Sequence, residues 1–267
     1  MERYKLDIEI SALEIRSKFD IESYGISDIF HLVEKMNILL IRYPIGKDTI
    51  CGFSTTYEGR KVIVSNSSEI LSREIFTVAH ELGHCIYDFE GEEQKILIDK
   101  KVNQQDDSYV ENRADYFAAV LLMPEEEIRK YMKYELRKDF SELKARDIIR
   151  LQAEFNVSFS TVLKRLNELK LIDTNKKSLL YEERDRYTSR TLFHIMKLDD
   201  RLLNTTDVIE VPKKYFDYAL SNYENGYVVF DKLKEALDIV GVDSDTIQKM
   251  KVQEENELDL EDLLGGF

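Results

Sequence analysis

The most informative stretch of the sequence spans residues 76–84 and reads FTVAHELGH. It contains the pattern H-E-x-x-H, in which His80 and His84 are separated by one helical turn. Residues at this spacing lie on the same face of a helix, so both imidazoles can reach a single metal ion. Glu81 lies about 100° around the helix axis, close enough to act on a metal-bound water without binding the metal itself. The pattern therefore predicts a metal site with Glu81 as its base.

A helix is predicted around this motif because apolar residues recur at spacings of three and four between residues 72 and 87. These residues are Ile75, Val78, Ala79, Leu82 and Ile86. Gly83 lies inside the predicted helix, although glycine costs about 1 kcal/mol there relative to alanine. We therefore expect another segment to pack closely against the helix at this glycine.

A third protein ligand is expected because catalytic zinc sites commonly combine two histidines with a carboxylate and keep a fourth position open. The best candidate is Glu111, near the start of a helical segment predicted over residues 109–122. Asp115 lies one turn further along the same face and can accept a hydrogen bond from the outer nitrogen of a zinc-bound histidine. The alternative third ligand is Asp88, one turn after His84.

A structural zinc site is the alternative to a catalytic one, but structural sites usually have four protein ligands and are rich in cysteine. The chain has two cysteines; Cys85 points away from the predicted metal-binding face, and Cys51 is isolated in the sequence. An open, catalytic-type Zn²⁺ site therefore fits these residues better. Glu111 and Asp115 also fit an ordinary solvated helix face on either side of Arg113.

The remaining patterns predict an α+β fold. Residues 37–43, 49–55 and 61–64 have the composition of β-strands, and a turn at residues 57–59 joins the last two. They predict a small antiparallel sheet ahead of the motif helix. Residues 91–108 predict a polar loop, and only helices are predicted after it.

Four segments are predicted along the chain. Residues 1–135 form the domain with the metal site, and residues 136–174 form a helical segment with helix-turn-helix spacing. Residues 175–252 form a mostly helical C-terminal region. Residues 253–267 form an acidic tail with interspersed leucines, for which no structure is expected.

The overall composition restricts the classes of function. The net charge of −14 disfavours general binding to nucleic acid, because phosphate contacts need clustered lysine and arginine. Residues 141–173 carry six basic and five acidic residues, so direct DNA binding is not expected despite the helix-turn-helix spacing. No apolar run reaches membrane-spanning length, and residues 1–10 lack the apolar core of a signal peptide. With two cysteines in the chain, a cytoplasmic protein with reduced thiols and no membrane contact is expected.

In these features the sequence resembles the ImmA/IrrE family of zinc metallopeptidases. The similarity rests on residues 76–84 and on residues 111–124, which read ENRADYFAAVLLMP. The ending LLMP is characteristic of the family. The resemblance is strongest from residue 26 to residue 124 and continues more weakly over residues 141–171, where the family often has a helix-turn-helix-like piece.

The resemblance implies a zincin-like domain with His80, His84 and Glu111 as Zn²⁺ ligands and Glu81 as the catalytic residue. It also implies an endopeptidase of narrow specificity whose protein substrate is a helix-turn-helix transcriptional repressor or a similar regulatory protein. Two other interpretations stay open. One is a non-proteolytic regulatory protein that keeps the zinc fold and inactivates a repressor by contact, and the other is a toxin–antitoxin component. The intact H-E-x-x-H pattern favours the enzyme, and the length beyond Asp173 favours the binding protein.

Overall fold

The computed structural model describes residues 2–57, 59–89, 96–98 and 107–242. The chain divides into two compact units, residues 1–208 and residues 209–267. The predicted acidic tail, residues 253–267, lies outside the described residues, as does the end of the predicted C-terminal region. The segment boundaries after residues 135 and 174 remain predictions.

The first unit contains a four-stranded sheet in the order β1-β3-β2-β4. The strands are β1 (Leu39–Tyr43), β2 (Gly52–Tyr57), β3 (Arg60–Asn66) and β4 (Ile96–Ile98). β2 and β3 form the predicted antiparallel hairpin, and β1 pairs with the other side of β3 in parallel, with Leu40 opposite Ile63. The α+β class is therefore confirmed, but the sheet is mixed rather than wholly antiparallel because the hairpin places β3, not β2, next to β1.

β4 lies where the sequence predicted a loop throughout residues 91–108. It pairs antiparallel with β2, with Leu97 opposite Ser54, at one edge of the sheet. Three residues are too few to show the alternation by which a strand is identified in a sequence. The conformation of β4 is therefore determined by its partner strand rather than by its own pattern.

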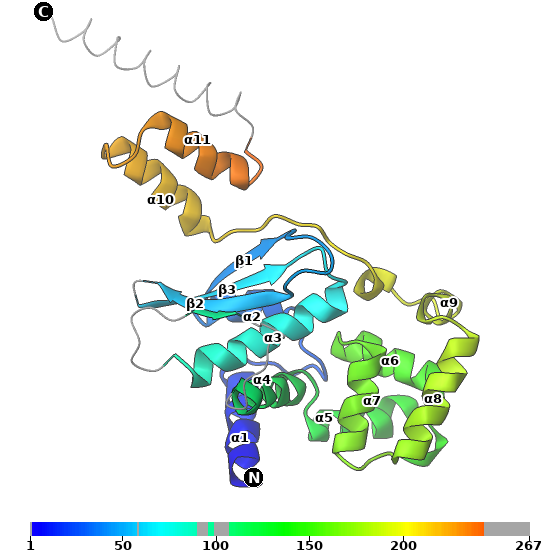
Figure 1. Cartoon of the computed structure of the whole chain (residues 1–267). Helices are drawn as coiled ribbons and strands as arrows, with labels where there is room; N and C mark the ends of the chain where they lie inside the picture. Colours follow the sequence, from blue (N-terminus) through cyan, green and yellow to red (C-terminus); the bar gives the residue numbers. More distant parts are fainter. Residues whose placement is uncertain (1, 58, 90–95, 99–106, 243–267) are drawn as a thin grey trace, which may run out of the picture. The chain divides into compact units, whose positions relative to one another are not determined.

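The helix that carries the motif, α3 (Leu71–Tyr87), lies between the sheet and two further helices (Figure 1). These are α4 (Asp107–Leu122), which packs on α3, and α1 (Glu2–Lys18), which packs on α4. A short helix, α2 (Ile29–Lys35), contacts both α3 and β1. Every residue of Thr77–Cys85 is buried, so the motif lies inside the main core rather than on the surface.

A buried ion pair attaches the start of α3 to the sheet. Arg42 in β1 donates from Nε to Glu74 Oε1 at 2.9 Å, and Ser65 in β3 donates to the same oxygen at 2.9 Å. Glu74 is fully buried in the first turn of α3, where a carboxylate also interacts favourably with the helix dipole. Removing one partner of a buried ion pair costs about 3–5 kcal/mol. This contact therefore gives the motif helix a fixed position on the sheet.

The rest of the first unit is helical. After Pro124 the elements are α5 (Glu125–Tyr131), a π-helix (Met132–Leu136), a 3-10 helix (Phe140–Glu142), α6 (Ala145–Phe155), α7 (Phe159–Glu168), α8 (Thr174–Arg186), α9 (Ser189–Ile195) and a 3-10 helix (Asp200–Leu203). The turn between α6 and α7 begins at Asn156, whose φ of 53° is left-handed. The chain then returns to α3, where Asn204 O accepts a hydrogen bond from Leu71 N at 2.9 Å.

In the second unit the described residues contain α10 (Lys213–Glu224) and α11 (Phe230–Ile239). They pack on each other around Leu233 and Leu237, which form a small core of their own. Among all helices in the described part of the chain, none combines the length and the apolar character needed to cross a membrane.

The close packing expected at Gly83 is confirmed. A Cβ atom at this position would lie 3.1 Å from the Phe117 ring and 3.2 Å from Ala114 Cα, both in α4. Gly83→Ala is therefore expected to lower the free energy of unfolding by about 1–3 kcal/mol through overpacking. Alanine would otherwise gain about 1 kcal/mol over glycine inside a helix. Urea denaturation measures the change, and a higher unfolding midpoint in the variant would contradict the expectation.

Candidate metal centre

Three side chains from α3 and α4 converge on one point. The Nε2 atoms of His80 and His84 lie 3.0 Å apart. The Glu111 carboxylate lies 3.2 Å from Nε2 of His80 and 3.6 Å from Nε2 of His84. One ligand atom of each residue lies within 4.8 Å of the others, which is close enough to hold a metal ion. Within the described residues this is the only such group of histidine, cysteine and acidic side chains.

In each of the two histidines, a carboxylate contacts Nδ1, the ring nitrogen that faces away from the shared point. Asp115 Oδ1 lies 3.1 Å from Nδ1 of His80, at the place where the sequence predicted a supporting carboxylate. Asp88 Oδ2 lies 2.9 Å from Nδ1 of His84. Asp88 is the alternative third ligand predicted from the sequence. The structure instead places it on the far side of the His84 imidazole, outside the converging group formed by His80, His84 and Glu111. The two cysteines are not part of that group either.

The donor set fits a divalent cation. When each Nδ1 donates its proton to a carboxylate, each neutral imidazole presents the lone pair of Nε2 to the shared point. The shared point is then surrounded by two nitrogen lone pairs and the Glu111 carboxylate, and none of these three groups presents a hydrogen-bond donor to it. Among the described residues, the charged side chains in and behind this group are four acids and two bases, and with both imidazoles neutral their net charge is −2: Glu81, Glu111, Asp88, Asp115, Arg113 and Lys164. A divalent cation would neutralise that charge.

The electrostatics of the site favour positive charge at the histidines. Burial lowers the pKa of His80, but hydrogen bonds to Asp115 and Glu111 outweigh it and raise the pKa to about 10. Burial likewise opposes protonation of His84, and its contacts with Asp88 and Glu111 raise the pKa to about 9. Hydrogen bonds from the two histidines lower the pKa of Glu111 to about 2. A metal ion must therefore displace protons from both imidazoles, so its affinity increases with pH.

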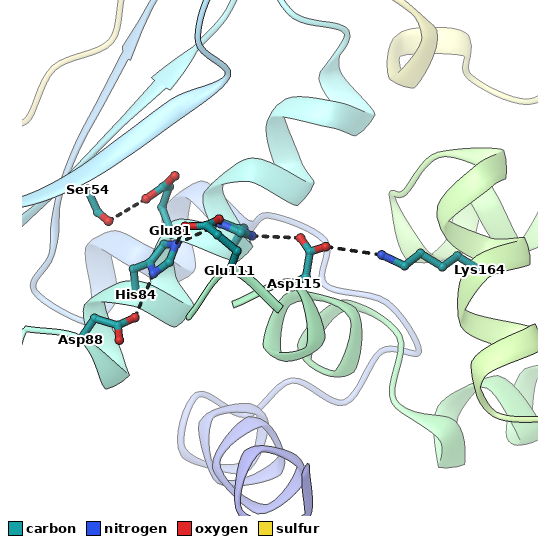
Figure 2. Close-up of polar contacts among 8 residues, drawn as sticks. Ser54, Glu81, His84, Asp88, Glu111, Asp115 and Lys164 are labelled. Atoms are coloured by element: carbon teal, nitrogen blue, oxygen red, sulfur yellow. Dashed lines mark hydrogen bonds and ion pairs between the residues drawn. The ribbon is translucent and has the colours of Figure 1, made fainter. Parts of the chain in front are cut away.

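Glu81 is held by a strand of the sheet. Ser54 Oγ in β2 donates to Glu81 Oε2 at 2.6 Å (Figure 2). Ser54 is fully buried and Glu81 is only 2% exposed, so water does not compete for this bond. Ser54 was not predicted from the sequence. Its only signal is a small polar residue at an inward-facing strand position, between Phe53 and Thr55 on the opposite face.

The site is open to solvent on one side. The side chains of His80 and His84 are 9% and 2% exposed, whereas that of Glu111 is 41% exposed. Asp115 is partly exposed on the same rim, and the exposed Lys164 reaches across from α7 to Asp115 Oδ2 at 3.4 Å (Figure 2). Solvent can therefore reach the three converging side chains from the side of Glu111, next to α7.

Comparison with known protein families agrees with this geometry. Residues 33–167, just over half of the 267-residue chain, match the Peptidase_M78 family model, which is described as the IrrE N-terminal-like domain. All the predicted site residues, as well as Ser54 and Lys164, lie within the matched range. No curated protein matches the chain.

Proposed function

Because this chain belongs to the IrrE N-terminal-like family of metallopeptidases, we propose that it is a zinc-dependent endopeptidase of narrow specificity. We propose a helix-turn-helix transcriptional repressor, or a similar regulatory protein, as its substrate, and the cytoplasm as its location. The observation that carries the proposal is the convergence of His80, His84 and Glu111 beside a buried Glu81.

The donor set supports zinc because two histidines and a carboxylate are the ligands of many catalytic zinc sites. His80, His84 and Glu111 would hold the ion. When bound, zinc supplies a Lewis acid that lowers the pKa of water to about 7 and polarises a carbonyl group. Sequence resemblance to the ImmA/IrrE family supports the class of substrate.

Glu81 would act as the proton carrier of the hydrolysis. It accepts a proton from the attacking water as the bond between the water oxygen and the peptide carbon forms. It then delivers that proton to the amide nitrogen as the C–N bond breaks. The bond from Ser54 to Oε2 keeps the Glu81 carboxylate in one orientation throughout these transfers. Low exposure of Glu81 also limits proton exchange with bulk water.

Ser54→Ala is expected to lower kcat with little change in KM or in metal content. Hydrogen bonds to charged groups contribute about 1.5–3 kcal/mol, which corresponds to a loss of roughly 10- to 100-fold if the whole contribution is made in the transition state. Thr55→Ala is the matched control, because Thr55 is the next residue of β2 and faces the opposite side of the sheet. Unchanged kcat in Ser54→Ala, or loss of the metal, would contradict the role of Ser54.

The proposed activity is tested by incubating the zinc-loaded full chain with a candidate helix-turn-helix repressor and identifying the products by mass spectrometry. One defined cut that disappears on chelation is expected. If the zinc-loaded protein binds this partner but leaves it intact, the peptidase proposal fails for that partner and the contact-acting regulator is favoured.

A second candidate function is regulation by binding alone. Residues 168–267 lie outside the family match, and the described residues 209–242 form a separate helical pair. Such a region suits a protein that inactivates a repressor by contact, or a component of a toxin–antitoxin pair. The two functions differ in their dependence on Glu81, because a binding protein would keep its regulatory effect when Glu81 is replaced by glutamine.

A further inference from the structure

The two imidazoles of the metal centre are supported in unequal ways. Each outer nitrogen contacts a carboxylate, and each carboxylate contacts a cation: Asp115 contacts Lys164, and Asp88 contacts Arg113. Asp115 is partly exposed and Lys164 is exposed, with 40% and 58% of their side-chain surface accessible. Asp88 and Arg113 are far more buried, at 9% and 20%. Solvent screens the first pair much more than the second.

A negative charge at Asp88 is unfavourable unless a nearby cation compensates it. Asp88 is the C-cap residue of α3, where the helix dipole disfavours a negative charge. Among the described residues, the Asp88 carboxylate contacts Nδ1 of His84 and the guanidinium of Arg113. When the His84 imidazole is neutral, as metal binding requires, Arg113 is the cation that compensates the charge of this carboxylate.

Arg113 itself packs against two aromatic rings. Its guanidinium lies 5.2 Å from the Tyr87 ring centre and 5.5 Å from the Tyr109 ring centre. Tyr87 precedes Asp88 at the end of α3, and Tyr109 lies one turn before Arg113 in α4. These contacts limit the freedom of the guanidinium and keep it directed at Asp88.

We infer that Asp88 and Arg113 are positioning residues that fix the tautomer and orientation of His84 and so set the affinity of the centre for its metal. Asp88 acts through His84 and is not a metal ligand. Asp115 and Lys164 support His80 in the same manner, but the link from Lys164 contributes little because it is long and solvated. The inference rests on the proposed binding of a metal by His80, His84 and Glu111.

The test measures zinc affinity of the full chain by competition with a chromophoric chelator. Asp88→Ala is expected to weaken zinc binding by about 10- to 100-fold, as is usual when a carboxylate behind a ligand histidine is removed. Arg113→Met, which keeps the length of the side chain but removes its charge, is expected to weaken binding by about tenfold. Lys164→Met is the matched control, with an expected change of less than about fivefold because the pair it breaks is exposed.

Asp88→Asn separates positioning from general disruption. The amide oxygen can still accept the Nδ1 proton, whereas the charge that Arg113 compensates is lost. Its zinc affinity is expected to lie between those of wild type and Asp88→Ala. Circular dichroism of each variant without metal shows whether it is folded, and Asp88→Asn serves as the test if the alanine variant does not fold.

The outcomes distinguish the inference from the function on which it rests. If wild type binds no zinc, the proposed metallopeptidase fails. If wild type binds zinc and the folded Asp88 and Arg113 variants bind it equally well, only the inference fails. An equal loss of affinity in Lys164→Met and Arg113→Met would overturn the claimed difference between the buried and the exposed pair.

Discussion

Glu81→Gln is expected to bind zinc as wild type does and to cleave the substrate about 10²- to 10⁴-fold more slowly. Glutamine has nearly the same shape as glutamate, and its amide oxygen can still accept the hydrogen bond from Ser54. It cannot take the proton from water or return it to the leaving amine. The loss should therefore appear in kcat, while metal content and the fold are unchanged.

The measurement compares kcat, KM and bound zinc in wild type and Glu81→Gln on the same substrate. Glu34→Gln is a suitable control because Glu34 belongs to α2, is 48% exposed and pairs with His31 at the surface. Cleavage by Glu81→Gln at a rate close to that of wild type would remove Glu81 from the mechanism. Loss of zinc from the variant would instead place Glu81 among the residues that hold the metal.

Removal of the metal is expected to lower the thermal midpoint by roughly 8–16 °C. A ligand present at about 1,000 times its Kd stabilises the folded state by about 4 kcal/mol. In a unit of this size, each kcal/mol shifts Tm by about 2–4 °C. The effect should increase as the pH is raised toward 9, because zinc must displace protons from His80 and His84, whose pKa values are about 10 and 9 without metal.

Thermal melting with and without a chelator measures this stabilisation. His84→Ala is the decisive comparison, since it removes a ligand and should melt at the same temperature under both conditions. A chelator-dependent shift of equal size in His84→Ala would mean that the stabilising metal binds elsewhere in the chain. No shift in wild type would contradict a metal centre in the core.

The placement of the converging group could be predicted because its residues lie on two helices with clear periodicity. The spacing of His80 and His84 placed both on one face of α3, and Gly83 indicated where a second helix approaches. The ENRAD segment then placed Glu111 on that second helix. These inferences needed only local spacing, which is the information that a single sequence carries most directly.

The residues that support the group could not be predicted in the same way. Ser54 reaches Glu81 from a strand far away in the sequence, and Arg42 reaches Glu74 only because β1 and α3 pack together. α1 was also missed, since its buried Ile8 alternates with the exposed Leu6 and Ile10 rather than forming one clear apolar face. Such contacts depend on tertiary packing, which local patterns do not encode.

The most direct test of the central claim is the zinc content of the purified, zinc-loaded full chain and of its His80→Ala variant, measured by mass spectrometry after removal of free metal. A single metal ion per chain in wild type, and none in His80→Ala, is the predicted result. Wild type without bound zinc, or a variant that retains as much zinc as wild type, would contradict a centre built from His80, His84 and Glu111.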